Sequence, residues 1–62
     1  MDDVVAHYGL AAAYAQKGKA SQALESLRKA IELNPKNKGG AAQDKAFDSL
    51  RANPEFKRLV GP

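Results

Sequence analysis

The chain contains no cysteine, so neither a disulfide nor a thiolate-bound metal holds its small core together. Its longest uninterrupted apolar run, Leu10 to Ala15, is far shorter than the roughly 18 residues that a membrane-spanning helix needs. The chain opens with Met1-Asp2-Asp3, which is acidic where a secretory signal peptide is basic. These absences predict a soluble protein, without a membrane partner, in the cytoplasm.

Large apolar side chains are also few. Alanine supplies much of the apolar content of the 62 residues, and tryptophan is absent. Ordering a chain of this length opposes folding by about 90 kcal/mol, at ~1.5 kcal/mol per residue, and so small a core offsets that only narrowly. We therefore expect modest stability, to which self-association or a packed neighbour would add.

The charge is mildly biased towards the positive sign, with a net charge of +3 and with acids interspersed among the bases. Interspersed charge is typical of a solvated surface. A basic edge for nucleic acid would consist of Lys36, Lys38, Lys57 and Arg58, but no aromatic residues for base stacking accompany it. A basic nucleic-acid-binding module is therefore the least favoured of the functions considered.

Two helical patterns occupy the first half of the chain. Asp2 and Asp3 are suited to cap a helix over about residues 3–17, and Gly18 follows its last periodic position. A second helix is predicted over residues 20–33, where Pro35 ends it. The apolar positions at steps of three and four are Val4, His7, Leu10, Ala11 and Tyr14, then Ala20, Ala23, Leu24, Leu27, Ala30 and Ile31. Because so few residues separate the helices, they are expected to pack antiparallel as a hairpin.

Two details of this hairpin have open or local interpretations. Gly9, inside the first helix, lowers stability by ~1 kcal/mol relative to alanine, so it marks either a close approach of another backbone or a plain weakness. On the second helix, Glu25 precedes Lys29 by one turn, and Arg28 precedes Glu32 in the same way. These spacings predict weak ion pairs on the exposed face.

The second half of the chain begins with a polar, basic segment over residues 36–40, and its glycine pair predicts a loop at 38–40. A third helix is expected from Ala41 to about Arg51, with its apolar face at Ala42, Ala46, Phe47 and Leu50. Asn53-Pro54-Glu55 then has the composition of a helix start, and a fourth helix follows with Phe56, Leu59 and Val60 on one edge. The prediction is one all-α domain over residues 1–62, in which a hairpin at 4–37 is followed by two shorter helices at 41–62.

No arrangement of residues indicates catalysis or a cofactor. His7 is the only histidine and stands at a position expected to pack inside the hairpin, while Ser21, Ser26 and Ser49 lack an adjacent base. Asp44 and Asp48 share a helix face, but two carboxylates without a further donor are a weak metal site. We therefore predict no catalytic residue, no metal and no cofactor.

The spacing His7-x-x-Leu10-Ala11-x-x-Tyr14, then Ala23-x-x-x-Leu27, Ala30 and Pro35, resembles one tetratricopeptide repeat (TPR) over residues 4–37. His7 stands where the family pattern has tryptophan, Ala11 where it has glycine, and Leu27 where it has an aromatic residue. The resemblance covers a little over half of the chain. It implies a helix-turn-helix hairpin of an α-solenoid, which stacks on neighbours and binds proteins rather than catalysing a reaction.

The segment from Phe47 to Val60 is similar to the closing segment, roughly D-x-x-x-L-R-x-x-P-x-F-x-x-L, of many bacterial TPR proteins. This similarity implies that the last two helices cap the end of a solenoid. The chain would then be a C-terminal piece of a longer array, a minimal family member or an engineered excision. One repeat with a cap is fewer than the roughly three repeats that a stable array needs, which favours a fragment or an oligomer.

The family resemblance also implies where a partner binds. In such arrays the first helix of each hairpin lines a groove, which here selects Val5, Tyr8, Ala12, Ala15 and Gln16. Tyr8 is the best anchor, because tyrosine is enriched at interaction hot spots, and its alternative role is packing inside or between hairpins. Family members that grip a C-terminal carboxylate use lysine and asparagine on this face, so Tyr8 and Ala12 argue against such a clamp.

Two functions therefore remain in view. The first is a non-enzymatic protein-interaction or scaffold module, whose first helix binds a partner peptide or an adjacent repeat. The alternative is a purely structural solenoid end cap, either self-associating or a designed or excised repeat. Sedimentation over a concentration series would separate these functions.

Overall fold

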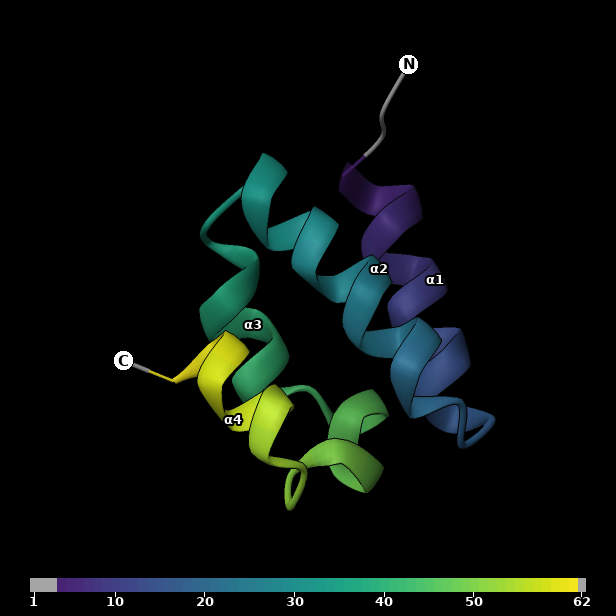
Figure 1. Ribbon diagram of the computed structural model, residues 1–62. Coiled ribbons are helices and arrows are strands. Elements are labelled where there is room, and N and C mark those ends of the chain that lie inside the picture. The colour runs from purple at the N-terminus through teal and green to yellow at the C-terminus, as the bar shows by residue number, and fades with distance from the viewer. Residues whose placement is uncertain (1–3, 62) are drawn as a thin grey trace.

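The computed structural model describes residues 4–61, with side chains from residue 6 onward. Its elements, in chain order, are α1 (Val4–Gln16), α2 (Ala20–Leu33), α3 (Asn37–Gln43), the 3₁₀ helix η1 (Lys45–Leu50) and α4 (Pro54–Val60) (Figure 1). No strand occurs within residues 4–61, so the all-α prediction is confirmed. The predicted capping by Asp2 and Asp3 concerns residues that lie outside this range.

Helices α1 and α2 form the predicted antiparallel hairpin (Figure 1). Gly18 makes the turn with a left-handed φ of 78°, a conformation that favours glycine. Small side chains are buried along the two helices of this hairpin: Ala11, Ala23 and Ala30 are each fully buried. Alanine at these positions lets the two backbones approach closely, and Leu27, also fully buried, fills the remaining space.

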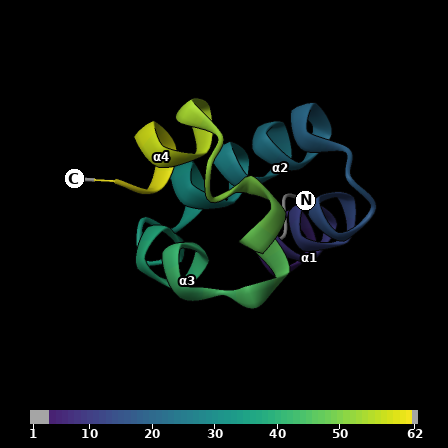
Figure 2. The same cartoon turned by 90° about the horizontal axis from the view of Figure 1, so that it is seen from below.

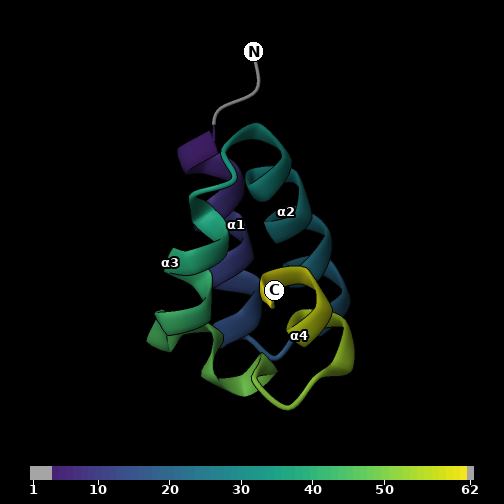
Figure 3. The ribbon, with the colours of Figure 1, turned by 90° about the vertical axis from the view of Figure 1, so that its left-hand side faces the viewer.

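The second half of the chain forms a shorter hairpin that stacks on the first. One arm consists of α3 and η1, and the other arm is α4 (Figure 1). Seen from below, α1 lies in one layer with α3 and η1, while α2 lies in the other layer with α4 (Figure 2). The side view shows the same division, with α3 beside α1 and α4 beside α2 (Figure 3). The contacts of α1 with η1, and of α2 with α3 and α4, hold the layers together.

The loop predicted at residues 38–40 is helical instead, because α3 begins at Asn37. The Asn34 side-chain oxygen accepts from the Lys36 backbone N–H at 3.1 Å, and the Asn37 amide donates to the Ala30 carbonyl at 3.0 Å. The start of α3 is thus tied to the end of α2, and Ala41 is fully buried one turn further on. Tertiary packing here outweighs the low helix propensity of the two glycines, which amounts to ~1 kcal/mol each.

The third helix predicted over residues 41–51 is interrupted at Asp44, whose backbone is extended with ψ at 126°. The Asp44 carboxylate accepts from the Ala46 backbone N–H at 2.9 Å, so it caps the first turn of η1. Arg51, an exposed residue, stabilises the interruption between α3 and η1. Its guanidinium pairs with Asp48 at 2.7 Å and donates to the backbone carbonyls of Ala42 and Asp44.

The fourth helix begins as predicted. The Asn53 side-chain oxygen accepts from the backbone N–H groups of Glu55 at 2.8 Å and Phe56 at 3.3 Å, and Pro54 occupies the first turn. Phe56 then points into the core, where it stacks on Phe47 with ring centroids 5.8 Å apart. Phe47 and Phe56, which the sequence placed on the apolar sides of the last two helices, thus both lie in the core.

Candidate functional site

The face of α1 that the sequence marked for a partner packs against the second half of the same chain. The Tyr8 ring meets Phe47 edge to face, with centroids 5.6 Å apart and planes at 84°. The Tyr8 hydroxyl donates to Asp44 Oδ2 at 2.8 Å. Tyr8 thus contacts both η1 and the residue that interrupts the second hairpin. This is the packing between hairpins that the sequence left open as its alternative role.

The electrostatics of this contact follow from its partners. Partial burial, the hydrogen bond to Asp44 and the negative charge of that carboxylate together raise the pKa of Tyr8 to about 12. The pKa of Asp44 lies below its usual value, because its charged form accepts from the Ala46 backbone N–H and from Tyr8, with a smaller contribution from the Arg51 guanidinium. Both shifts favour the state in which neutral tyrosine donates to ionised aspartate.

The other residues of the predicted face lie in different surroundings. Ala15 is 1% exposed, and its carbonyl accepts from the Ser49 hydroxyl of η1 at 3.0 Å. Ala12 is half-buried against the core, whereas Gln16 is exposed at the end of α1. The side chain of Val5 lies outside the described part of the chain. The structure thus places Tyr8 and Ala15 against the chain's own second hairpin and Ala12 against the shared core, and a partner contact by these residues stays a prediction.

A groove of about 290 Å³ runs along the hairpin and is called the outer groove below. It is lined by His7, Leu10 and Tyr14 of α1 and by Gln22, Glu25, Ser26 and Lys29 of α2. Leu10 is 48% exposed there, while His7 and Tyr14 are half-buried. The sequence pattern includes these three residues among the apolar positions of the first helix, and it predicts that His7 packs inside the hairpin. In the structure His7 is half-buried and lines the outer groove, and Leu10 lies exposed beside it.

The composition of α1 is the signal that could have revealed this surface. Its 13 residues, VVAHYGLAAAYAQ, include no aspartate, glutamate, lysine or arginine. A helix that is apolar on all sides is typical of the interior of a larger assembly. Here α2 and η1 cover two sides of α1, and the outer groove lies on another.

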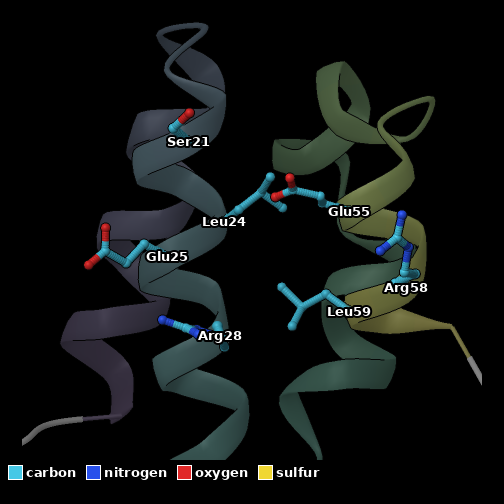
Figure 4. A pocket seen from close by; sticks show the side chains of 7 residues that line it. All are labelled: Ser21, Leu24, Glu25, Arg28, Glu55, Arg58 and Leu59. Carbon is cyan, nitrogen blue, oxygen red and sulfur yellow. The ribbon is translucent and has the colours of Figure 1, made fainter.

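A second groove, of about 650 Å³, lies between α2 and α4 and is called the α2–α4 groove below (Figure 4). Leu24 and Leu59 reach towards each other from its two walls. The polar lining consists of Ser21, Glu25 and Arg28 on α2 and Glu55 and Arg58 on α4. Four of these residues are charged, namely Glu25, Arg28, Glu55 and Arg58. Within the described residues, none of their side chains makes an ion pair or a hydrogen bond. The weak pairs expected for Glu25 with Lys29 and for Arg28 with Glu32 are not formed.

The titratable groups do not gather into a metal-binding cluster within the described part of the chain. No group of three histidines, cysteines or carboxylates is placed there to hold a metal ion. Asp44 is engaged by Tyr8, and Asp48 is engaged by Arg51. The same range of residues contains no helix of the length and apolarity needed to cross a membrane.

Comparison with known proteins agrees with the architecture. The family model of the tetratricopeptide repeat matches residues 4–37, which contain all of α1 and α2 and the first residue of α3. No curated protein and no solved structure matches the chain significantly.

Proposed function

The chain belongs to the tetratricopeptide repeat family, and from that premise we propose that it is a non-enzymatic module that holds a helical segment of another protein, or of an adjacent repeat, in its outer groove. Repeats of this family generally mediate protein–protein interaction and are generally not catalytic. The proposal assigns this role to a particular surface of this chain.

The observation that carries the proposal is an apolar helix with one face uncovered. Helix α1 contains no aspartate, glutamate, lysine or arginine. Even so, Leu10 leaves 48% of its surface exposed in the outer groove. Exposed apolar surface with a polar rim is typical of an interaction site. Lys29, Glu25 and Gln22 of α2 supply that rim. A helical partner with small and apolar side chains would cover Leu10 and leave these polar groups at the edge.

The face of α1 that carries Tyr8 supports the same interpretation, because it already packs against a helical neighbour. Tyr8, Ala12 and Ala15 of α1 receive η1 and its flanking residues, so the hairpin already binds one helical neighbour from its own chain. In a stacked array each hairpin contacts a neighbour on both sides. The sequence-predicted face would thus serve the adjacent hairpin. Among the members of that set whose side chains are described, Gln16 is exposed and accessible to a further partner.

A site-specific photocrosslinking experiment tests the proposal. A benzophenone amino acid is placed at position 10, inside the outer groove, and in matched chains at position 13 or 16, which are exposed positions of α1 outside it. We expect position 10 to crosslink to a helical segment and position 13 to give no specific product. A product at position 16 would instead locate the partner on the face that the sequence predicted.

A second change makes the result specific to the groove. Adding Tyr14→Asp to the position 10 chain puts a charge into the outer groove, so the crosslinked product should fall at least tenfold while the helical circular dichroism stays unchanged. Equal yields at positions 10 and 13, or a yield that does not respond to Tyr14→Asp, would contradict the proposal.

A further inference from the structure

We propose that the α2–α4 groove is a self-association surface, in which two copies of the chain meet about a twofold axis that runs along the groove. This surface is separate from the outer groove except for Glu25, which stands on the ridge between them and lines both. The inference therefore does not depend on the function proposed above.

The first argument is the charge of the groove. It contains two acids, Glu25 and Glu55, and two bases, Arg28 and Arg58, so it is neutral although the chain as a whole carries +3. On both walls the acid precedes the base by three residues. A surface that pairs with its own copy needs equal numbers of both signs, since each group meets the copy of another group. This groove meets that condition.

The second argument is the placement of the charges. Figure 4 shows Glu25 and Arg58 on the outer flanks of opposite walls, at a similar level along the groove, with Leu24 and Leu59 between them. A twofold axis along the groove places α2 of one copy over α4 of the other. Glu25 then faces Arg58 of the other copy, and the reciprocal pair forms on the opposite flank.

The third argument is the layout that results. The half-buried Leu59 side chains of the two copies would meet in the centre, beside Leu24, which leaves 8% of its surface exposed, and the two Glu25–Arg58 pairs would flank them. An apolar centre within a polar rim is the usual anatomy of a protein interface. Each of these charges lacks a partner within its own described chain, so no existing ion pair is broken on association.

The size of the surface predicts a weak dimer. A stable specific interface covers about 800 Å² on each partner, which would be roughly a fifth of the 4175 Å² surface of this chain. The seven residues of the groove provide the centre of such an interface but only part of its area. We therefore expect association in the upper micromolar to millimolar range, as for other small interfaces.

Sedimentation equilibrium of the full chain over that concentration range measures the association. The average mass should rise from 6.6 kDa towards twice that value. Glu25→Arg alone and Arg58→Glu alone each place like charges opposite each other twice, so each should weaken association at least tenfold. An equimolar mixture of these two variants restores both attractive pairs in a mixed dimer, and the double variant restores them in a homodimer.

Glu32→Arg is the matched control, because it makes the same charge change on an exposed residue of α2 outside both grooves. It should leave association within about twofold of the parent. Circular dichroism of all variants confirms that the fold is retained.

Three outcomes would overturn the inference. The first is a parent chain that stays monomeric throughout the range. The second is an association that survives Arg58→Glu unchanged, or that neither the mixture nor the double variant recovers. An association that withstands Arg58→Glu but disappears with Leu10→Lys would place self-association in the outer groove, which refutes this inference while leaving the proposed interaction role in place.

Discussion

The hydroxyl of Tyr8 donates to Asp44 Oδ2 at 2.8 Å, across 36 positions of the sequence. Tyr8 belongs to the first hairpin, and Asp44 interrupts the long arm of the second. The same carboxylate caps η1 through the Ala46 backbone N–H. One aspartate therefore both breaks the second hairpin and attaches the break to α1.

Removing this hydroxyl should weaken the attachment of the two hairpins. Tyr8→Phe keeps the ring against Phe47 and deletes the donor to Asp44, so we expect the free energy of unfolding to fall by about 1 kcal/mol. Urea denaturation measures the change. Tyr14→Phe is the control, because the Tyr14 hydroxyl makes no hydrogen bond within residues 4–61, and it should change stability much less. Equal losses from both substitutions would show that the Tyr8–Asp44 bond does not contribute.

The same pair predicts the pH dependence of stability. The pKa of Asp44 is lowered from 3.8 in the folded chain, so its contribution is present above pH 3.8 and is lost as the pH falls through the folded value. The pKa of Tyr8 is raised from 10.0 to about 12, so its contribution is present below pH 10.0 and is lost as the pH rises towards 12.

Thermal unfolding of the parent chain and of Tyr8→Phe as a function of pH measures both effects. The difference in unfolding temperature between the two chains should narrow at each end of the pH range. Both chains contain the same lysines, so the effect of lysine titration on the unfolding temperature cancels in this difference. A gap that is constant from pH 3 to pH 12 would contradict the assignment of the shifts to this pair.

Among the substitutions considered, removal of the Phe47 ring should lower the free energy of unfolding most. It is fully buried and contacts both Tyr8 and Phe56, so Phe47→Ala is expected to lower the free energy of unfolding by about 3–5 kcal/mol. That is comparable to the whole stability of a domain this small. Circular dichroism on heating should show loss of the cooperative transition. Leu33→Ala, at a position that is 43% exposed, serves as the control and should shift stability by no more than about 0.5 kcal/mol.

Two glycines should respond to alanine with opposite signs. Gly9 lies inside α1, and a Cβ placed there meets nothing within 4 Å, so Gly9→Ala should stabilise the chain by about 1 kcal/mol through helix propensity. Gly18 has a φ of 78°, so Gly18→Ala should destabilise the chain by about 1 kcal/mol. Chemical denaturation of both variants measures the effects, and the double variant should lie near the parent. A destabilising Gly9→Ala would contradict the open surroundings of Gly9.

The agreement between sequence and structure is best where chemistry is local. Gly18 ends the first helix, Asn53 caps the last, and both act through their own or nearby backbone groups. The repeat spacing likewise located the hairpin, and the apolar positions Ala11, Ala23 and Ala30 are buried in it. The structure favours a plain weakness for the choice that the sequence left open at Gly9, because a Cβ placed there meets no other described residue within 4 Å.

The structure differs from the sequence predictions where contacts between residues distant in sequence determine the local conformation. The glycine pair of 39 and 40 has the local propensity of a loop, but contacts with α2 and the burial of Ala41 keep it helical. The interruption at Asp44 depends on Tyr8, which is remote in sequence. The candidate binding surfaces changed for the same reason, since Tyr8 and Ala15 are covered by the second hairpin while Leu10 is left exposed.

The sequence by itself determined that this protein is an all-α member of the tetratricopeptide repeat family, because periodicity, capping residues and repeat spacing act over one or two helical turns. The tertiary structure alone decided which faces of those helices stay accessible. A helix such as α1, apolar around its whole circumference, carries no local record of which side its neighbours cover. The second hairpin determines which side of α1 is covered, because Phe47, Asp44 and Ser49 contact Tyr8 and Ala15.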